Sequence, residues 1–213
     1  MTEMAVDTTP VVRALGQVGY AHALAGMRQF TALRTEETPD ELWLLEHPPV
    51  YTLGHGANAA HGPKLANGID VVRVERGGEI TYHGPGQLVC YTLVDIARRA
   101  IKVREFVRLL EQSLIDLLAS NGVRAARKPG APGVYVDGAK VAALGIRITR
   151  GRAFHGVALN VDMDLAPFMA IDPCGYPGLA ITQTRDLGIA ASAGHLGQAL
   201  ASQISVHLGA HHA

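Results

Sequence analysis

The chain has 213 residues, 48% of them hydrophobic, which is enough for one domain with a substantial core. Its 19 basic and 19 acidic residues give a formal net charge of zero at pH 7, so it lacks the basic character typical of nucleic-acid-binding proteins. No apolar run reaches the roughly 18 to 20 residues of a membrane span, and residues 1–10 lack the apolar core of a secretory signal. We therefore expect one cytoplasmic domain over residues 1–213, with a disordered tail at about 209–213.

The first part of the chain predicts one helix followed by short strands. Tyr20, Leu24 and Met27 recur at three- and four-residue steps, which favours a helix over residues 16–34. Three strand-like apolar segments follow in sequence: 41–46, 50–53 and 69–75.

Residues 76–87 form a glycine-rich stretch. Four glycines, a proline, an arginine and a histidine lie within these twelve residues, and the apolar run 88–94 that follows is typical of a buried strand. Glycine is used where the backbone turns tightly or where a ligand must approach bare backbone. Because the stretch is longer than a hairpin turn needs, we favour a ligand-contacting loop that joins two core strands over a plain turn with a polar tip.

The second part predicts two further helices and a β-hairpin. Residues 97–121 show the clearest amphipathic pattern in the chain, and Asp137-Gly138 is a preferred tight-turn pair between strands at 134–136 and 140–148. The remaining expectations are a return to the sheet at 123–126, a loop at 127–133, a strand at 154–161, a short helix or turn at 162–170, a loop at 172–178 and a helix at 196–208. The mixture of hairpin-like strands and three helices predicts an α+β fold.

The two cysteines, expected to be free thiols in a reducing cytosol, have different surroundings. Cys174 lies between Pro173 and Gly175, which favours access to substrate. A thiol near pKa 8.5 becomes a nucleophile when a cation or base lies beside it, although an ordinary loop cysteine fits the sequence equally well. Cys90 lies inside an apolar run and is expected to be buried and inert.

Lys140 and His83 are the other candidates for chemistry. Strand alternation places Lys140 on the apolar face of the strand 140–148, where it is partly desolvated or paired with an anion such as a thiolate, unless it reaches back to water. His83 could donate to a developing oxyanion, or could be a solvated or capping side chain. The ten histidines show no metal-binding spacing.

Small residues recur on two successive predicted strands. Without side-chain volume there, the strands could border a narrow apolar slot, or could pack tightly against a helix. The residues concerned are Ala142, Ala143, Gly145, Gly156 and Ala158.

Four segments in this order resemble the bacterial octanoyltransferases of lipoate biosynthesis, also called the lipoate-protein ligase B family: residues 76–87, 140–145, 155–160 and 173–175. The resemblance extends over about residues 43–187. It implies the fold of the biotin and lipoate protein ligases, a mixed β-sheet with flanking helices. It also implies an acyltransferase that needs no cofactor or metal. The implied donor is octanoyl-acyl carrier protein, and the implied acceptors are lysines on the lipoyl domains of 2-oxo acid dehydrogenase E2 subunits and on the glycine cleavage H protein.

The resemblance also assigns roles to residues. It makes Cys174 the catalytic nucleophile that forms an acyl-thioester and Lys140 its catalytic partner. The implied substrate-binding residues are Arg76, Gly77, Gly78, Glu79, Ile80, Thr81, Tyr82, His83, Ala143, Leu144, Gly145, Gly156, Val157 and Ala158. Two alternatives are an ATP-dependent lipoate or biotin ligase, which would not need Cys174, and a non-catalytic module that binds acyl groups or lipoyl domains.

Overall fold

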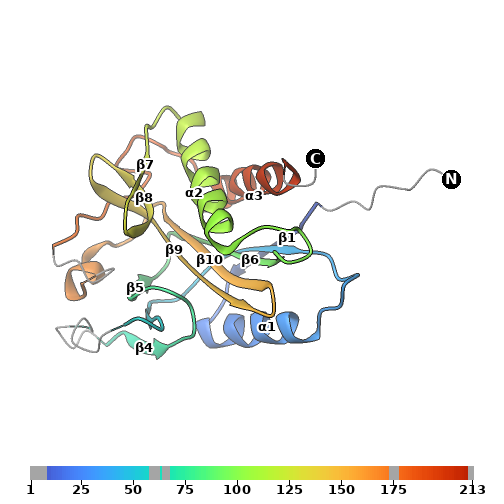
Figure 1. Ribbon diagram of the computed structural model, residues 1–213. Coiled ribbons are helices and arrows are strands. Elements are labelled where there is room, and N and C mark those ends of the chain that lie inside the picture. The colour runs from blue at the N-terminus through green and yellow to red at the C-terminus, as the bar shows by residue number, and fades with distance from the viewer. Residues whose placement is uncertain (1–8, 58–62, 64–67, 173–177, 211–213) are drawn as a thin grey trace.

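The computed structural model describes residues 9–57, 63, 68–172 and 178–210, and its centre is a seven-stranded mixed sheet (Figure 1). The strands, in spatial order, are β1 (Val11–Gln17), β2 (Glu41–Glu46), β6 (Gln87–Asp95), β10 (Arg152–Asn160), β9 (Ala139–Thr149), β8 (Ala131–Val136) and β7 (Ala126–Lys128). Strand β1 pairs parallel with β2, and every other neighbouring pair in this sheet is antiparallel. The α+β fold with a mixed sheet is thus confirmed.

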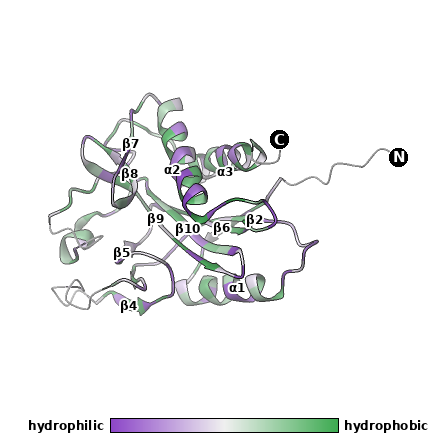
Figure 2. Cartoon of the chain, viewed as in Figure 1, coloured by the Kyte–Doolittle hydropathy of each residue, from purple (hydrophilic) through white to green (hydrophobic). Residues whose placement is uncertain are grey.

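Helices cover both faces of this sheet. Helix α1 (Tyr20–Leu33) lies on one face, and α2 (Val103–Ser120) and α3 (Ala193–Gly209) lie on the other (Figure 1). The buried stripe of α2 includes Phe106, Leu110 and Leu114, which recur every four residues and therefore point toward the sheet. Figure 2 shows hydrophobic residues along β9, whereas α2 alternates between hydrophobic and hydrophilic positions.

A second, three-stranded sheet forms the other wall of the candidate active site. It has the order β4 (Asp70–Arg73), β3 (Val50–Leu53) and β5 (Ile80–His83). A short 3-10 helix, η2 (Ala166–Ala170), packs against it, and Tyr51, Tyr82 and Phe168 belong to one apolar cluster there. This sheet holds the glycine-rich stretch against the large sheet.

Two expectations about the glycine-rich stretch are wrong. The stretch is not only a loop, because residues 80–83 form β5, which pairs antiparallel with β3. It also does not join two core strands, since β4 before it is largely exposed and belongs to the small sheet. The alternating burial of Ile80 and Tyr82 explains why this polar-looking segment is a strand.

Other boundaries differ for local reasons. The N-terminal strand β1 was not predicted; it includes Gly16, at a φ of 66°, and ends at Gln17, so α1 begins at Tyr20 and not at residue 16. Helix α2 begins at Val103 because the chain first makes a turn with Ala100 at a φ of 53°. The predicted loop at 127–133 overlaps β7 and β8.

The C-terminal helix also departs from expectation. Helix α3 continues to Gly209, so the predicted disordered tail at 209–213 begins too early. Leu208 is fully buried and anchors the last turn. Residues 211–213 lie outside the described part of the chain.

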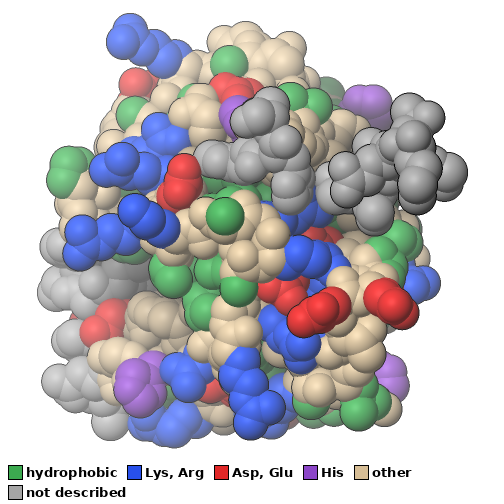
Figure 3. Space-filling view, turned by 45° about the vertical axis from the view of Figure 1, so that its right-hand side comes forward, with side chains coloured by type: hydrophobic (Ala, Val, Ile, Leu, Met, Phe, Trp, Pro, Cys, Tyr) green, Lys and Arg blue, Asp and Glu red, His purple; other side chains and the backbone are tan. Residues whose placement is uncertain are grey.

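The predicted hairpin is confirmed: Asp137 and Gly138 have φ values of 48° and 84°, the left-handed pair that a tight turn between β8 and β9 requires. In the part of the chain that the structure describes, no helix is long and apolar enough to span a membrane. Positive and negative side chains are interspersed over the face drawn in Figure 3, in keeping with the zero net charge.

Candidate active site

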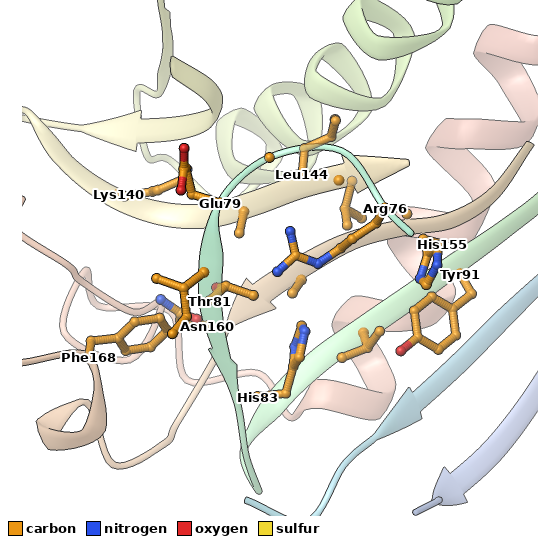
Figure 4. Close-up of a pocket in the computed structure, with 18 of the residues that line it drawn as sticks. Arg76, Glu79, Thr81, His83, Tyr91, Lys140, Leu144, His155, Asn160 and Phe168 are labelled. Carbon is orange, nitrogen blue, oxygen red and sulfur yellow. The ribbon is translucent and has the colours of Figure 1, made fainter. Parts of the chain in front are cut away.

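A pocket lies between strands β9 and β10 of the large sheet and β5 of the small sheet (Figure 4). Lys140 and twelve of the fourteen predicted substrate-binding residues line it; the other two, Gly77 and Tyr82, do not. The lining also includes seven residues that sequence reasoning did not select: Tyr20, Val89, Tyr91, His155, Asn160, Phe168 and Ile181. Segments distant in sequence therefore meet here, and the ligand-binding role of the lining stays a prediction.

Arg76 and three glycines fix the edge of the pocket. The Arg76 guanidinium donates to the carbonyl and hydroxyl oxygens of Thr52 at 2.7 and 2.8 Å and to the Gly77 carbonyl at 2.9 Å. The Gly77 N–H donates to the Ile146 carbonyl at 2.9 Å, which ties the stretch to β9. A side chain on Gly54 would overlap the Gly78 carbonyl, so the two loops need glycine to approach this closely.

Small residues form the floor of the pocket. Gly145 pairs with Gly156, and Ala143 pairs with Ala158, across strands β9 and β10. All four line the pocket, in agreement with the predicted slot, whereas Ala142 belongs to the core on the side of α2 and α3. The floor is therefore flat and apolar.

Replacing Gly156 with alanine should test how tightly this floor is packed. Its new methyl group would overlap the backbone carbonyl of Cys90 on the neighbouring strand. Because backbone cannot rotate away, we expect the free energy of unfolding to fall by about 2 kcal/mol or more, measured by urea denaturation. Gly194→Ala is the control, since nothing lies within 4 Å of a side chain at that position. Equal stability of the two variants would contradict the tight floor.

Lys140 is buried near the start of β9, five residues before Gly145. Its exposed fraction is 4%, so the alternative in which it reaches back to water is wrong. The side-chain nitrogen, Nζ, donates to the Pro132 carbonyl at 2.8 Å and lies 5.5 Å from the centre of the Tyr135 ring. A side chain on Gly133 would come within 2.6 Å of Lys140 Cε, so glycine at 133 leaves the room that this lysine occupies.

Cys174, the predicted nucleophile, lies outside the described residues. The described chain resumes at residue 178, and residues 180–182 flank Lys140: the Lys140 N–H donates to the Ala180 carbonyl at 2.8 Å, and the Thr182 N–H donates to the Lys140 carbonyl at 3.0 Å. A second pocket is lined by Asp172 and by residues 178–181, and it shares Phe168 and Ile181 with the first.

Cys90 is fully buried in β6, as expected. Burial raises the pKa of its thiol to about 12, so almost no thiolate exists at neutral pH. Cys90 is therefore excluded as a nucleophile, and thiol chemistry in this chain is left to Cys174.

The hydrogen bonds around His83 fix which of its ring nitrogens carries the proton. The Gln87 amide nitrogen donates to the Tyr82 carbonyl and to Asn160 Oδ1, so Gln87 Oε1 must accept from His83 Nδ1, 2.7 Å away. The proton thus sits on Nδ1, and Nε2 faces the Thr52 hydroxyl at 3.5 Å. This network argues against His83 as an oxyanion donor. The Gly77 N–H is not available as an oxyanion donor either, because it donates to the Ile146 carbonyl.

Three histidines are held neutral in this region. Burial lowers the pKa of His83 to about 3 and that of His155 to about 4, with the Arg76 charge adding to both shifts. Burial also lowers the pKa of His47, whose Nδ1 donates to the Val18 carbonyl and whose Nε2 accepts from the Tyr91 hydroxyl. The folded protein therefore binds fewer protons here than the unfolded chain does.

Mild acid should consequently destabilise the protein. An unfolded histidine titrates near pH 6.5, so the stability linked to these groups is complete above that pH and is lost as the pH falls toward the folded pKa values. Between pH 7.5 and 5, His83 and His155 should each remove about 2 kcal/mol from the free energy of unfolding, measured in urea. His155→Asn should lose the part of this pH dependence that His155 contributes. The control His195→Asn, at an exposed position, should keep the pH dependence of wild type. Identical pH dependence in both variants would refute this.

Comparison with known proteins adds independent information. The lipoyl protein ligase A/B catalytic domain family matches residues 19–204. The chain is 55% identical over 199 residues to an octanoyltransferase from Dechloromonas aromatica, covering 93% of this chain and 95% of that protein.

Two solved structures share the fold. A crystal structure of lipoate-protein ligase A bound with ATP superposes with a TM-score of 0.78 at 16% identity, covering 94% of this chain and 85% of the other. A structure from a study of a bipartite lipoate protein ligase and its E2 lipoyl domain from Thermoplasma acidophilum gives 0.78 at 17% identity, covering 95% and 84%. These likenesses confirm the predicted ligase-like fold.

Proposed function

Because this chain belongs to the lipoyl protein ligase A/B catalytic domain family, and within it to the octanoyltransferases, we propose that it moves octanoyl from octanoyl-acyl carrier protein to the ε-amine of a lysine on a lipoyl domain. The chain is an acyltransferase, which rules out the non-catalytic binding module. Lipoyl domains of E2 subunits and the glycine cleavage H protein are the proposed acceptors. One structural observation supports the proposal most. The buried Lys140 lies at an apolar pocket, and its backbone N–H and carbonyl are hydrogen-bonded to Ala180 and Thr182, which follow Cys174 in the chain.

The proposed first half-reaction forms an acyl-enzyme. Lys140 takes the proton from the Cys174 thiol, and the thiolate attacks the carbonyl carbon of the carrier thioester. The bond from that carbon to the carrier sulfur breaks, and Lys140 returns the proton to the departing carrier thiolate. Octanoyl is then held on Cys174 as a thioester.

The second half-reaction repeats these steps with an amine. The lysine amine of the lipoyl domain attacks the acyl-enzyme carbonyl, an amide bond forms and the bond to Cys174 breaks. The proton lost by the amine passes through Lys140 to the cysteine sulfur, so the enzyme is regenerated. Because the acyl group arrives already activated as a thioester, the balance needs neither ATP nor a metal.

The pocket is proposed to hold the acyl chain. Its floor of Gly145, Gly156 and Ala158 offers an apolar surface without projecting side chains. Each methylene buried there contributes about 0.8 kcal/mol to binding. Chain binding thereby positions the thioester carbon at the end of the pocket where Lys140 lies.

The donor separates this proposal from an ATP-dependent ligase. With octanoyl-acyl carrier protein and a lipoyl domain, we expect the domain to gain one octanoyl group without ATP, measured by intact mass. Free octanoate with ATP should give no product. A lipoyl domain whose target lysine is replaced by arginine is the control. Transfer from octanoate only when ATP is present would overturn the proposed reaction.

A further inference from the structure

Asn160 lies at the end of the pocket where acyl transfer is proposed. It is the last residue of β10, whose register pairs Leu159 with Ala142 on β9, so Asn160 lies opposite the residue that follows Lys140. Figure 4 shows Asn160 in the same half of the pocket as Lys140, with His155 in the other half. The residue is 4% exposed and lines the pocket, so its polar atoms act inside the protein.

Hydrogen bonds fix how the Asn160 amide is oriented. The Thr182 carbonyl can only accept, so the Asn160 atom that lies 3.0 Å from it is Nδ2, which donates. Asn160 Oδ1 accepts from Gln87 Nε2 at 2.9 Å. Gln87 is held in turn by its bonds to the Tyr82 carbonyl and to His83 Nδ1. The amide therefore cannot rotate without breaking one of its bonds.

One N–H of this amide is left over. Nδ2 carries two hydrogens, and the Thr182 carbonyl is the one acceptor that Nδ2 has among the residues that the structure describes. A buried N–H without an acceptor is costly and calls for an explanation. Because Asn160 lines the pocket, a ligand bound there is the natural source of the missing acceptor.

The same contacts hold Asn160 in a fixed position relative to Lys140. Thr182 accepts from Asn160 through its carbonyl and donates to the Lys140 carbonyl through its N–H. The Thr184 N–H donates to the Asn160 carbonyl at 2.9 Å. Residues 180–184 thus tie the end of β10 to the start of β9, and the remaining N–H of Asn160 is preorganised beside Lys140.

The proposed reaction needs a donor at this place. In both half-reactions the attack on the acyl carbon places a negative charge on the carbonyl oxygen. A preorganised N–H in a site shielded from water stabilises such an oxyanion. His83 and the Gly77 N–H are not available for this, since each is bonded elsewhere.

We propose that Asn160 is a catalytic residue whose second amide N–H hydrogen-bonds the oxyanion formed in both half-reactions. The inference rests on the proposed function, because it takes acyl transfer beside Lys140 as the reaction. The amide moves no proton: it donates to the oxygen while the tetrahedral intermediate exists and keeps its hydrogen when the carbonyl re-forms and the sulfur departs. The ligand atom that it recognises is the carbonyl oxygen of an acyl thioester.

Two reactions of the Cys174 thiol separate a donor from a structural residue. Acylation by octanoyl-acyl carrier protein develops an oxyanion, whereas alkylation by iodoacetamide displaces iodide without one. Both are followed by intact mass in the full-length protein, with the modified peptide mapped. In Asn160→Ala we expect single-turnover acylation to slow by about 10² to 10³-fold and alkylation to stay within about threefold of wild type.

Gln183→Ala is the matched control. Gln183 Oε1 accepts from the Met163 N–H at 2.7 Å, so its loss loosens the same segment, but Gln183 does not line the pocket beside Lys140. Both of its rates should stay close to those of wild type. Asn160→Ser covers the case in which the alanine variant fails to fold. Its hydroxyl keeps the site polar but lies one bond closer to the backbone than Nδ2, so acylation should again slow while alkylation does not.

Failure of the inference is read on the variants, and failure of the proposed function on wild type. If acylation and alkylation slow together in Asn160→Ala, the residue acts only by holding Thr182, and the inference is wrong. It is also wrong if acylation is unchanged, if Gln183→Ala shows the same selective loss, or if neither Asn160 variant folds. If wild type is acylated but a lipoyl domain gains no octanoyl, the proposed function is wrong and the role of Asn160 in acylation stands.

Discussion

Cys174→Ser is expected to lower the rate of octanoyl transfer by about 10⁴-fold or more, the scale on which loss of a nucleophile acts in enzymes with covalent catalysis. A serine hydroxyl is far less acidic than a thiol and forms an ester that resists the attacking amine. The direct measurement is intact mass after mixing with octanoyl-acyl carrier protein. Wild type should carry one octanoyl adduct, and Cys174→Ser should carry none.

The second cysteine supplies the matched control. Cys90→Ala should still form the adduct, because Cys90 is fully buried and its thiol pKa is raised to about 12. Mapping the adduct to a peptide that contains Cys90, or full transfer activity in Cys174→Ser, would end the proposed mechanism.

Lys140→Met should lower the transfer rate by about 10² to 10⁴-fold, the usual range for a proton-transferring group. Methionine fills similar space against Tyr135 without a charge or a donor, so the fold should tolerate the change. Single-turnover kinetics over a range of pH are the measurement. We expect slow formation of the acyl-enzyme and a pH profile that has lost the limb due to the Cys174–Lys140 pair.

Lys128→Met provides the control for Lys140. Lys128 also lies against the Tyr135 ring, at 5.9 Å from its centre, but it is exposed and does not line the pocket. Its replacement should leave rate and pH profile unchanged. Equal losses in the two variants would mean that both lysines act through packing on Tyr135, and Lys140 would then have no part in proton transfer.

Sequence reasoning succeeded where local chemistry decides the structure. The Asp137-Gly138 turn has a strong backbone preference, and the stripe of α2 has a clear period, so both were predictable. The small residues on β9 and β10 predicted the pocket floor because side-chain volume is encoded directly in residue type.

Elements that depend on distant partners were missed. Strand β1 is exposed along its whole length and exists because it pairs with β2, a strand that follows α1 in the sequence. Strand β5 is hidden in a glycine-rich segment and exists because it pairs with β3. His155 could not have been placed at all, since strand alternation assigns it to the opposite face from Phe154. Its signals were its polarity within the run 154–161 and its place at the start of the family-like segment 155–160.

The strand order of the large sheet has a consequence during synthesis. Strand β6, buried along all nine residues, lies between β2, which is made earlier, and β10, which is made much later. A ribosome adding about 5 to 20 residues per second needs roughly 3 to 13 seconds to pass from the end of β6 to the end of β10. Throughout that interval one edge of an apolar strand has no partner in the nascent chain, which is the kind of surface that chaperones bind and that other unfinished chains can join.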